Sequence, residues 1–195
     1  VQTCALPIFK GIRRDRYYLS TKVGKYTQPG AYGQDILDYS RSRICSSLDE
    51  SAGRLGTDYF DIIHLHDFEY QHCRHTDWAL GEGVAALLEL KQAGRIGNVS
   101  AGIYPMDLWH RIFESVPIDA ALVHNHYTLS DTRAMELLPA AKARGIGIIN
   151  GSPFGSGLLS GREPADWHPA GEADRRCFRA ATEFCESRGV PISKL

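Results

Sequence analysis

The stretch that decides the fold is Tyr59-Phe-Asp-Ile-Ile-His-Leu-His66, a short run of mainly apolar residues that predicts a buried strand. Ahead of it, Ser40 can cap a helix that carries Ile44 on its apolar face, and Gly56 is the type of residue that ends a helix. A helix that stops at a glycine directly before an apolar strand is the repeating unit of an α/β protein.

The same alternation of strand and helix continues on both sides of this stretch. Further strands are predicted at residues 16–23, 98–102, 120–126 and 147–150. Further helices are predicted at residues 84–93, 108–113, 131–144 and 175–187, with the first turn of another at 191–195. Loops are predicted around the Pro29/Gly30/Gly33 segment and before residue 84. This order requires right-handed crossovers and a parallel sheet, so the fold class is α/β.

The glycine-rich segment 155–161 distinguishes between the two main parallel-sheet folds. It lacks the G-x-G-x-x-G spacing and comes late in the chain, so the dinucleotide-binding fingerprint of a doubly wound sheet is absent. We therefore expect a (β/α)8 TIM barrel. Such a barrel needs about 250 residues, and about five of its eight strands can be found in this chain, so we expect it to be incomplete.

Composition excludes several classes of protein. With 22 Lys+Arg against 23 Asp+Glu, the net charge is −1, which provides no positive field for a nucleic acid or an anionic membrane. Apolar runs stay shorter than the roughly 18 residues of a membrane helix, and no secretory signal begins the chain, so we expect a cytoplasmic protein. The five cysteines form no C-x-x-C pair and suggest no disulfide framework.

The predicted strands end in polar residues, and barrel enzymes carry their chemistry at the carboxyl ends of strands. His64 and His66 leave the same side of a strand, and His124 and His126 repeat this spacing. Such pairs can bind zinc in a metal-dependent barrel hydrolase, although in those enzymes the pair lies on the first strand. Lys22, at the end of the preceding strand, fits a hydride-transfer site better, so we expect no metal.

Six stretches of the sequence resemble consecutive landmarks of the aldo-keto reductases. They begin with Tyr17-Tyr-Leu-Ser-Thr-Lys-Val-Gly24 and continue at residues 47–55, 58–67, 88–96, 141–148 and 152–159. The similarity covers nearly everything from Tyr17 onward. Within the family, residues 66–70 and 166–170 resemble the sugar dehydrogenase branch.

The resemblance implies a (β/α)8 barrel that binds NAD or NADP and uses a tetrad of Asp, Tyr, Lys and His. Lys22 matches the lysine that lowers the pKa of the tyrosine, and His66 matches the histidine that orients the substrate oxygen. The Asp and Tyr of such enzymes lie on an earlier strand and loop, which this chain does not contain. Tyr17 and Tyr18 do not take their place.

The resemblance also implies a set of coenzyme-binding residues. Gly102 and His124 align with positions that hold the nicotinamide carboxamide, although neither side chain matches, and the usual stacking tyrosine aligns with Gly151. Four residues match the pyrophosphate loop: Ser152, Phe154, Gly155 and Leu158. Small residues there let backbone N–H groups approach phosphate oxygens.

These matches imply an oxidoreductase that oxidises C1 of an aldose, an L-galactose-like sugar in its lactol form, to the lactone by hydride transfer to NAD or NADP. The alternatives are a reductase of aldehydes or ketones in the same family, a metal-dependent barrel hydrolase, and a non-catalytic coenzyme-binding subunit. In each enzymatic case the expected partner is a small molecule, with no nucleic acid or membrane.

The first residues depart from this pattern. Residues 1–8 resemble no part of the family and coincide with a translated sequencing adapter, so we expect a non-native segment there. Residues 9–195 are then a partial barrel domain. Because five strands leave two open edges and the tetrad tyrosine is missing, we expect this chain alone to be inactive.

Overall fold

The computed structural model describes residues 11–27, 36–161, 168 and 170–194. They fall into two compact units, one within residues 1–122 and 139–149 and the other within residues 123–138 and 150–195. The expected non-native segment 1–8, the predicted loop around Pro29 and Gly33, and most of the branch motif at 166–170 lie outside the described residues. The predictions made for these segments stay predictions.

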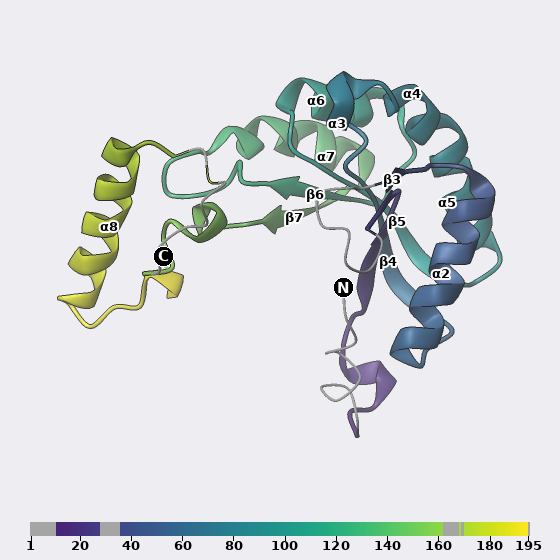
Figure 1. The fold of residues 1–195 in the computed structure, drawn as a ribbon, viewed down its shortest axis with the longest axis horizontal. Coiled ribbons are helices and arrows are strands. Elements are labelled where there is room, and N and C mark those ends of the chain that lie inside the picture. Colours follow the sequence, from purple (N-terminus) through teal and green to yellow (C-terminus); the bar gives the residue numbers. More distant parts are fainter. Residues whose placement is uncertain (1–10, 28–35, 162–167, 169, 195) are drawn as a thin grey trace. The chain divides into compact units, whose positions relative to one another are not determined.

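A five-stranded sheet organises the first unit, and its last two strands run on into the second. Its strands are β1 (Ser20–Val23), β4 (Phe60–His66), β5 (Ile96–Ile103), β6 (Ala120–His124) and β7 (Gly147–Gly151), in the order β1-β4-β5-β6-β7. β4 pairs in parallel with both β1 and β5, which lie on either side of it (Figure 1). The short strands β2 (Lys25–Tyr26) and β3 (Ile36–Leu37) form a separate antiparallel pair. The predicted α/β class is confirmed.

Helices connect the strands of the sheet. The longer ones are α2 (Arg41–Leu55), α5 (Val84–Gln92), α6 (Met106–Ser115), α7 (Leu138–Arg144) and α8 (Glu172–Glu186). The short ones are α3 (Tyr70–Cys73), α4 (Thr76–Trp78), the π-helical segment η2 (Ala79–Gly83) and the 3-10 helices η1 (Arg14–Arg16), η3 (Arg133–Leu137), η4 (Gly155–Gly157) and η5 (Ile192–Lys194). No helix among the described residues has the length and apolar character needed to cross a bilayer.

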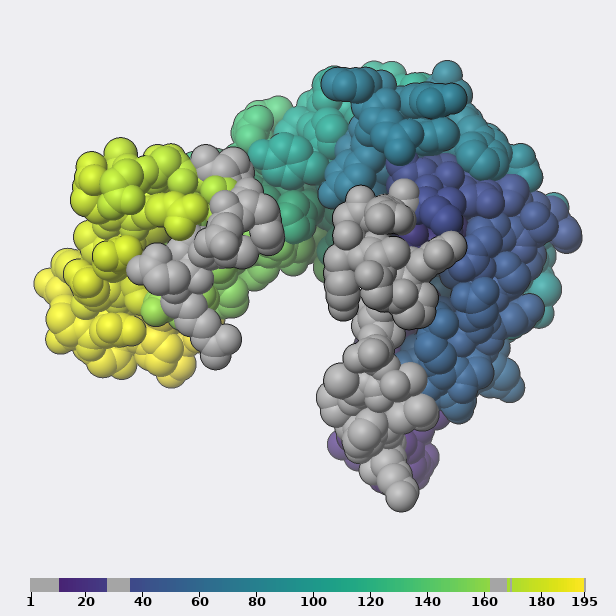
Figure 2. Space-filling model, in the orientation of Figure 1, coloured from purple at the N-terminus to yellow at the C-terminus, as the bar shows by residue number. Residues whose placement is uncertain are grey.

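Helix α2 forms as its sequence predicts. The Ser40 hydroxyl accepts a hydrogen bond from the Arg43 N–H at 3.3 Å, a cap that is typically worth about 1 kcal/mol. At the other end, Gly56 adopts a left-handed conformation with φ 64° and donates its N–H to the Ala52 carbonyl. Ile44 is fully buried, while the outer side chains of the helix form part of the surface of the first unit, in blue in Figure 2.

Packing in the first unit fixes the strand that carries the site. Ile63 of β4 and Leu87 of α5 are fully buried, and α5 contacts both β5 and α2. At the start of β4, the Asp61 carboxylate accepts hydrogen bonds from the Leu19 N–H and the Arg14 guanidinium, both at 2.6 Å. This buried framework holds β1 and β4 in register.

Several predicted boundaries are wrong. The strand predicted at 16–23 begins at Ser20, because the preceding residues form η1. The strand predicted at 98–102 is longer and spans Ile96–Ile103. The strand predicted to reach His126 ends at His124, since Asn125 turns the chain with φ 62°.

Two helical predictions also differ from the structure. The predicted loop before residue 84 contains α3, α4 and η2. The helix predicted at 131–144 is divided into η3 and α7, because Pro139 has no N–H to continue the hydrogen-bond ladder of one regular helix. The predicted first turn at 191–195 is the short turn η5.

Candidate active site

The two residues predicted to be catalytic lie at the carboxyl ends of neighbouring strands. Lys22 of β1 stands in register with His64 of β4, and His66 follows two residues later on the same face. Both side chains lie close enough to His64 for their charges to lower its pKa. Lys22 is exposed, and its strand β1 lies at one end of the described sheet.

His64 is a buried, neutral histidine rather than an open ligand. Only 3% of its surface is exposed. The Ser100 hydroxyl donates to the Ala101 carbonyl at 3.2 Å, so the Nδ1–H of His64 donates to the Ser100 oxygen at 2.8 Å. Burial, with smaller contributions from Lys22 and His66, lowers the pKa of His64 to about 4. Within the described ranges, no group of three or more His, Cys, Asp or Glu residues could hold a metal ion.

His66 is held from several directions. Its Nδ1 lies 3.0 Å from an oxygen of Asp67. The buried Tyr39 donates its hydroxyl to the His66 carbonyl at 3.0 Å. A Cβ atom at Gly102 would lie 3.1 Å from Cδ2 of His66, so a larger residue at position 102 would press on the ring. The side chain keeps 23% of its surface exposed, which leaves the ring accessible to a ligand.

Asp67 lies between His66 and a lysine ammonium. Its other oxygen lies 2.9 Å from the ammonium of Lys25, and that ammonium stands 4.4 Å from the centre of the Tyr70 ring. Burial alone would raise the pKa of Asp67, but the hydrogen bond from His66 and the charge of Lys25 outweigh it and hold the pKa below its usual value. The sequence analysis assigned no role to Asp67 or to Lys25.

Glu69 is the second acidic residue of this loop. One of its oxygens accepts the Tyr104 N–H at 3.1 Å, while the other is buried with no hydrogen-bond partner. Burial raises the pKa of Glu69 to about 7 against the hydrogen bond from Tyr104, and the charge of Asp67 adds to the rise. The sequence places Glu69 in a family-like motif but shows nothing of this burial.

We predict that Glu69→Gln stabilises the protein at high pH. A carboxyl group with a pKa raised by folding costs stability as the pH rises from its usual 4.5 through about 7. The amide stays neutral, so the variant should gain on the order of 2 kcal/mol at pH 8 and nothing at pH 4. Urea unfolding at the two pH values measures this, with the exposed Glu183→Gln as control. Equal shifts in both variants would contradict the assignment.

In the second unit, the structure brings together two of the predicted coenzyme residues. Ser152 and the Nδ1 of His124 lie 3.3 Å apart, and the Asn125 N–H donates to the Gly151 carbonyl at 2.8 Å, which fixes the two segments side by side. Ser152 itself has a positive φ of 57°. The predicted neighbourhood of His124 and Ser152 therefore exists, although their coenzyme role stays a prediction.

The segment after Ser152 is a series of tight turns. Gly155 adopts φ 58° and receives the Leu158 N–H at 3.2 Å, while the Phe154 carbonyl receives the Leu159 N–H at 3.1 Å. The segment contains small, apolar and hydroxyl side chains and no acidic one. The lack of negative charge fits a pyrophosphate group, because no acidic side chain of this segment repels it.

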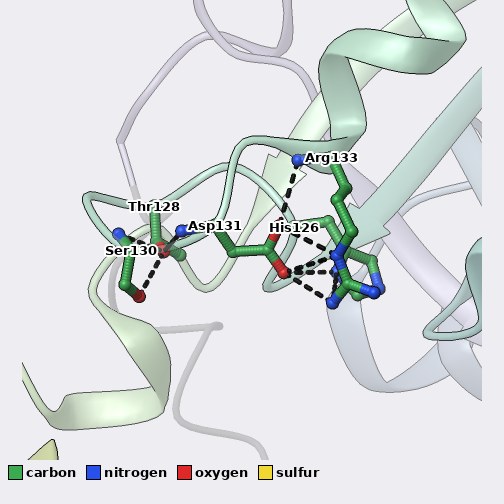
Figure 3. A network of polar contacts seen from close by, with 5 residues as sticks. All are labelled: His126, Thr128, Ser130, Asp131 and Arg133. Carbon is green, nitrogen blue, oxygen red and sulfur yellow. Dashed lines mark hydrogen bonds and ion pairs between the residues drawn. The ribbon is translucent and has the colours of Figure 1, made fainter.

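His126, the second histidine of the His124-Asn-His126 pattern, contacts residues of the loop that follows it. It is 1% exposed, and its Nδ1 lies 3.0 Å from Asp131 (Figure 3). Arg133 donates to the same carboxylate at 2.7 Å and holds the pKa of Asp131 well below its usual value. The hydroxyl of Thr128 accepts the Asp131 N–H at 3.1 Å. The second H-x-H pattern is thus divided between a strand end and a buried loop contact.

Comparison with protein families identifies the fold to which this site belongs. Residues 7–195 match the model of the aldo/keto reductase family, and this match includes all described residues. The chain belongs to the aldo/keto reductase family. The five-stranded sheet is accordingly part of a (β/α)8 barrel, as predicted, and the chain is of an oxidoreductase family.

Curated aldo/keto reductases with similar sequences include sugar dehydrogenases. L-galactose dehydrogenase of Arabidopsis thaliana is 35% identical over 187 residues, which are 94% of this chain and 56% of that protein. D-arabinose 1-dehydrogenase of Saccharomyces cerevisiae is 29% identical over 194 residues, 93% of this chain and 54% of that protein. The chain therefore spans about half the length of the curated relatives it matches.

Solved structures support the same fold. The holo form of an aldo-keto reductase from Bacillus halodurans superposes with a TM-score of 0.69 at 23% identity, over 97% of this chain and 65% of that one. A glycerol dehydrogenase from Gluconobacter oxydans gives a TM-score of 0.65 at 17% identity, over 92% of this chain and 58% of that one. At these identities the likeness concerns the fold alone.

Proposed function

We propose that this chain is part of an NAD(P)-dependent dehydrogenase that oxidises C1 of an aldose, in its lactol form, to the lactone. The observation that carries the proposal is the placement of Lys22 and accessible His66 near the ends of paired strands, both close to buried His64. The curated relatives named for L-galactose, D-arabinose and D-threo-aldose oxidation support this choice of substrate class.

The roles of the protein groups follow from this placement. The bound coenzyme supplies a nicotinamide ring that takes up the hydride from C1. His66 holds the C1 hydroxyl through its accessible ring edge. The ammonium of Lys22 would stabilise the tetrad tyrosine of the complete barrel as a phenolate, and this phenolate would accept the hydroxyl proton and become a neutral phenol.

A second set of residues holds the coenzyme, either NAD or NADP. In the first unit, Gly102 leaves room beside the His66 ring. In the second unit, the proposed contacts are His124, Ser152, Phe154, Gly155 and Leu158. The hydroxyl of Ser152 and the turns around Gly155 suit phosphate oxygens, and the acid-free composition of the loop supports this role.

Coenzyme-linked oxidation of sugars by the complete gene product tests the proposal. L-galactose and D-arabinose are supplied with NAD⁺ or NADP⁺, and formation of the reduced coenzyme is followed. We expect turnover with at least one of these sugars and formation of the lactone. Reduction of aldehydes without sugar oxidation would favour a carbonyl reductase instead, and coenzyme binding without any turnover would favour a non-catalytic subunit.

Metal content is a separate prediction. We expect less than one equivalent of any transition metal per chain after purification. The Nδ1 of His64 is hydrogen-bonded to Ser100, so His64 and His66 do not present a pair of ring nitrogens to one metal ion. Elemental analysis measures this. Zinc near one equivalent, lost together with a hydrolase activity in His66→Ala, would contradict the proposed function.

A further inference from the structure

The peptide group between His66 and Asp67 is held from both sides. Its carbonyl accepts a hydrogen bond from the Tyr39 hydroxyl at 3.0 Å, and its N–H donates to the Gly102 carbonyl at 3.3 Å. The carbonyl and the N–H of a trans peptide point in opposite directions, so the two contacts together fix the orientation of the peptide plane. One contact comes from the segment before α2, and the other comes from the end of β5.

This orientation needs support because it places Asp67 in a left-handed conformation. The φ of Asp67 is 59°, a value that residues other than glycine keep only where the surrounding contacts outweigh the strain. A change of this φ to the negative range would alter the path of the chain after His66. It would also shift the Asp67 carboxylate, which lies 3.0 Å from Nδ1 of the His66 ring. The held peptide therefore determines the surroundings of that ring.

The Tyr39 side chain that holds the peptide is enclosed by other aromatic rings. It is fully buried and packs edge to face against Phe68 and Trp78, with ring centroids 6.4 and 5.8 Å away. Burial raises the pKa of Tyr39, so its hydroxyl keeps the proton that it donates to the His66 carbonyl. A side chain without exposed surface cannot touch a bound sugar or coenzyme, so any effect of Tyr39 on a reaction passes through the peptide.

Gly24 makes the approach of the Tyr39 ring possible. It follows Lys22 by two residues and adopts φ 105°, a conformation that side chains rarely permit. A Cβ atom at Gly24 would overlap Cε1 of Tyr39, and it would lie 2.8 Å from Cδ1 of that ring and 3.2 Å from the His66 carbonyl oxygen. The Gly24 carbonyl accepts the Asp38 N–H at 3.0 Å, which ties the same segment to β1. The chain directly after Lys22 thus packs on the Tyr39 ring and on the His66 carbonyl.

We infer that Tyr39 is a positioning residue that, seated against Gly24, holds the His66–Asp67 peptide and thereby keeps His66 aligned with Lys22. This inference rests on the proposed function and deepens it, because it adds a buried residue on which turnover depends. The tyrosine takes no part in proton transfer, since its hydroxyl is bonded to a backbone carbonyl.

Tyr39→Phe is the most direct variant. Phe keeps the ring and its aromatic contacts and removes only the donor to the His66 carbonyl. We expect kcat for aldose oxidation by the complete gene product to fall about 10- to 100-fold, because small displacements of a catalytic group have effects of this size. The dissociation constant of the coenzyme should not change. Tyr18→Phe is the matched control and should keep normal turnover, because it removes the same atom from a side chain that is 89% exposed.

Amide hydrogen exchange of the same proteins reads the hold on the peptide without any sugar. We expect the Asp67 amide to be protected in the unaltered protein and to exchange at least about tenfold faster in Tyr39→Phe. The amide of Leu65, a buried residue of β4, is the internal reference, since a general loss of stability would accelerate its exchange as well. Tyr18→Phe should leave the ratio of the two exchange rates unchanged.

Three results would overturn the inference. The first is an Asp67 amide that exchanges in the unaltered protein as fast as an amide of an exposed loop, and this result needs no variant to fold. The second is an unchanged exchange ratio in Tyr39→Phe, and the third is a raised ratio with normal turnover of the aldose. A gene product that oxidises no sugar would reject the proposed function, while a raised exchange ratio in its Tyr39→Phe variant would still support the hold on the peptide.

Discussion

Lys22→Met in the complete gene product should lower the turnover of an aldose by about 10²- to 10⁴-fold, the usual contribution of proton transfer to and from a reacting group. Methionine keeps the length of the side chain and removes its charge. Without the ammonium, the phenolate that accepts the hydroxyl proton loses its stabilising cation. The proposed coenzyme contacts lie around Gly155 and do not include Lys22, so the dissociation constant of the coenzyme should stay within about twofold.

Steady-state kinetics and coenzyme titration separate these effects. The matched control is Lys142→Met, since Lys142 is exposed on α7 and has no place in the proposed site. The control should retain normal turnover. Unchanged turnover and an unchanged pH profile in Lys22→Met would show that Lys22 has no part in the chemistry.

His64 should make the protein sensitive to acid. Folding lowers the pKa of His64 from its usual 6.5 to about 4, so the unfolded chain takes up a proton in this range while the folded protein does not. Stability is therefore fully present above pH 6.5 and is lost as the pH falls towards 4. The shift corresponds to about 3 kcal/mol.

Glu69 masks part of this effect. Because its pKa is raised by folding, its protonation increases stability as the pH falls through nearly the same range in which His64 decreases it. The clean measurement is urea unfolding at pH 7 and pH 4.5 in the Glu69→Gln background, with and without His64→Asn. The added asparagine cannot titrate, and its amide can still donate to Ser100. We expect most of the acid-induced loss to disappear in the double variant. An equal loss in both proteins would assign the sensitivity to other groups.

Local signals made most of the fold predictable. The helix between Ser40 and Gly56 needs only a capping hydroxyl and a residue that accepts a positive φ, and both are visible in the sequence. The apolar run that ends at His66 has enough β-branched and aromatic residues to be a strand wherever it packs. The alternation of such units predicted an α/β barrel, and the family match confirms this fold.

The rest depends on contacts between residues far apart in the chain. Nothing local distinguishes buried His64 from accessible His66, because the difference comes from Ser100 on the next strand. The role of Lys25 depends on a turn that brings it to Asp67 across more than forty residues of sequence. Asn125 ends its strand through a backbone conformation that its residue type permits but does not require.

The strand order β1-β4-β5-β6-β7 has a consequence for how this protein is made. Within the described sheet, each strand after β1 pairs with the strand of this sheet synthesised before it, so its partner is already present when it leaves the ribosome. The growing polypeptide can bury each apolar strand soon after it emerges. This shortens the time for which unpaired strand edges are exposed to other nascent chains. Rare codons placed between these units would slow translation at points where the emerged portion is already paired.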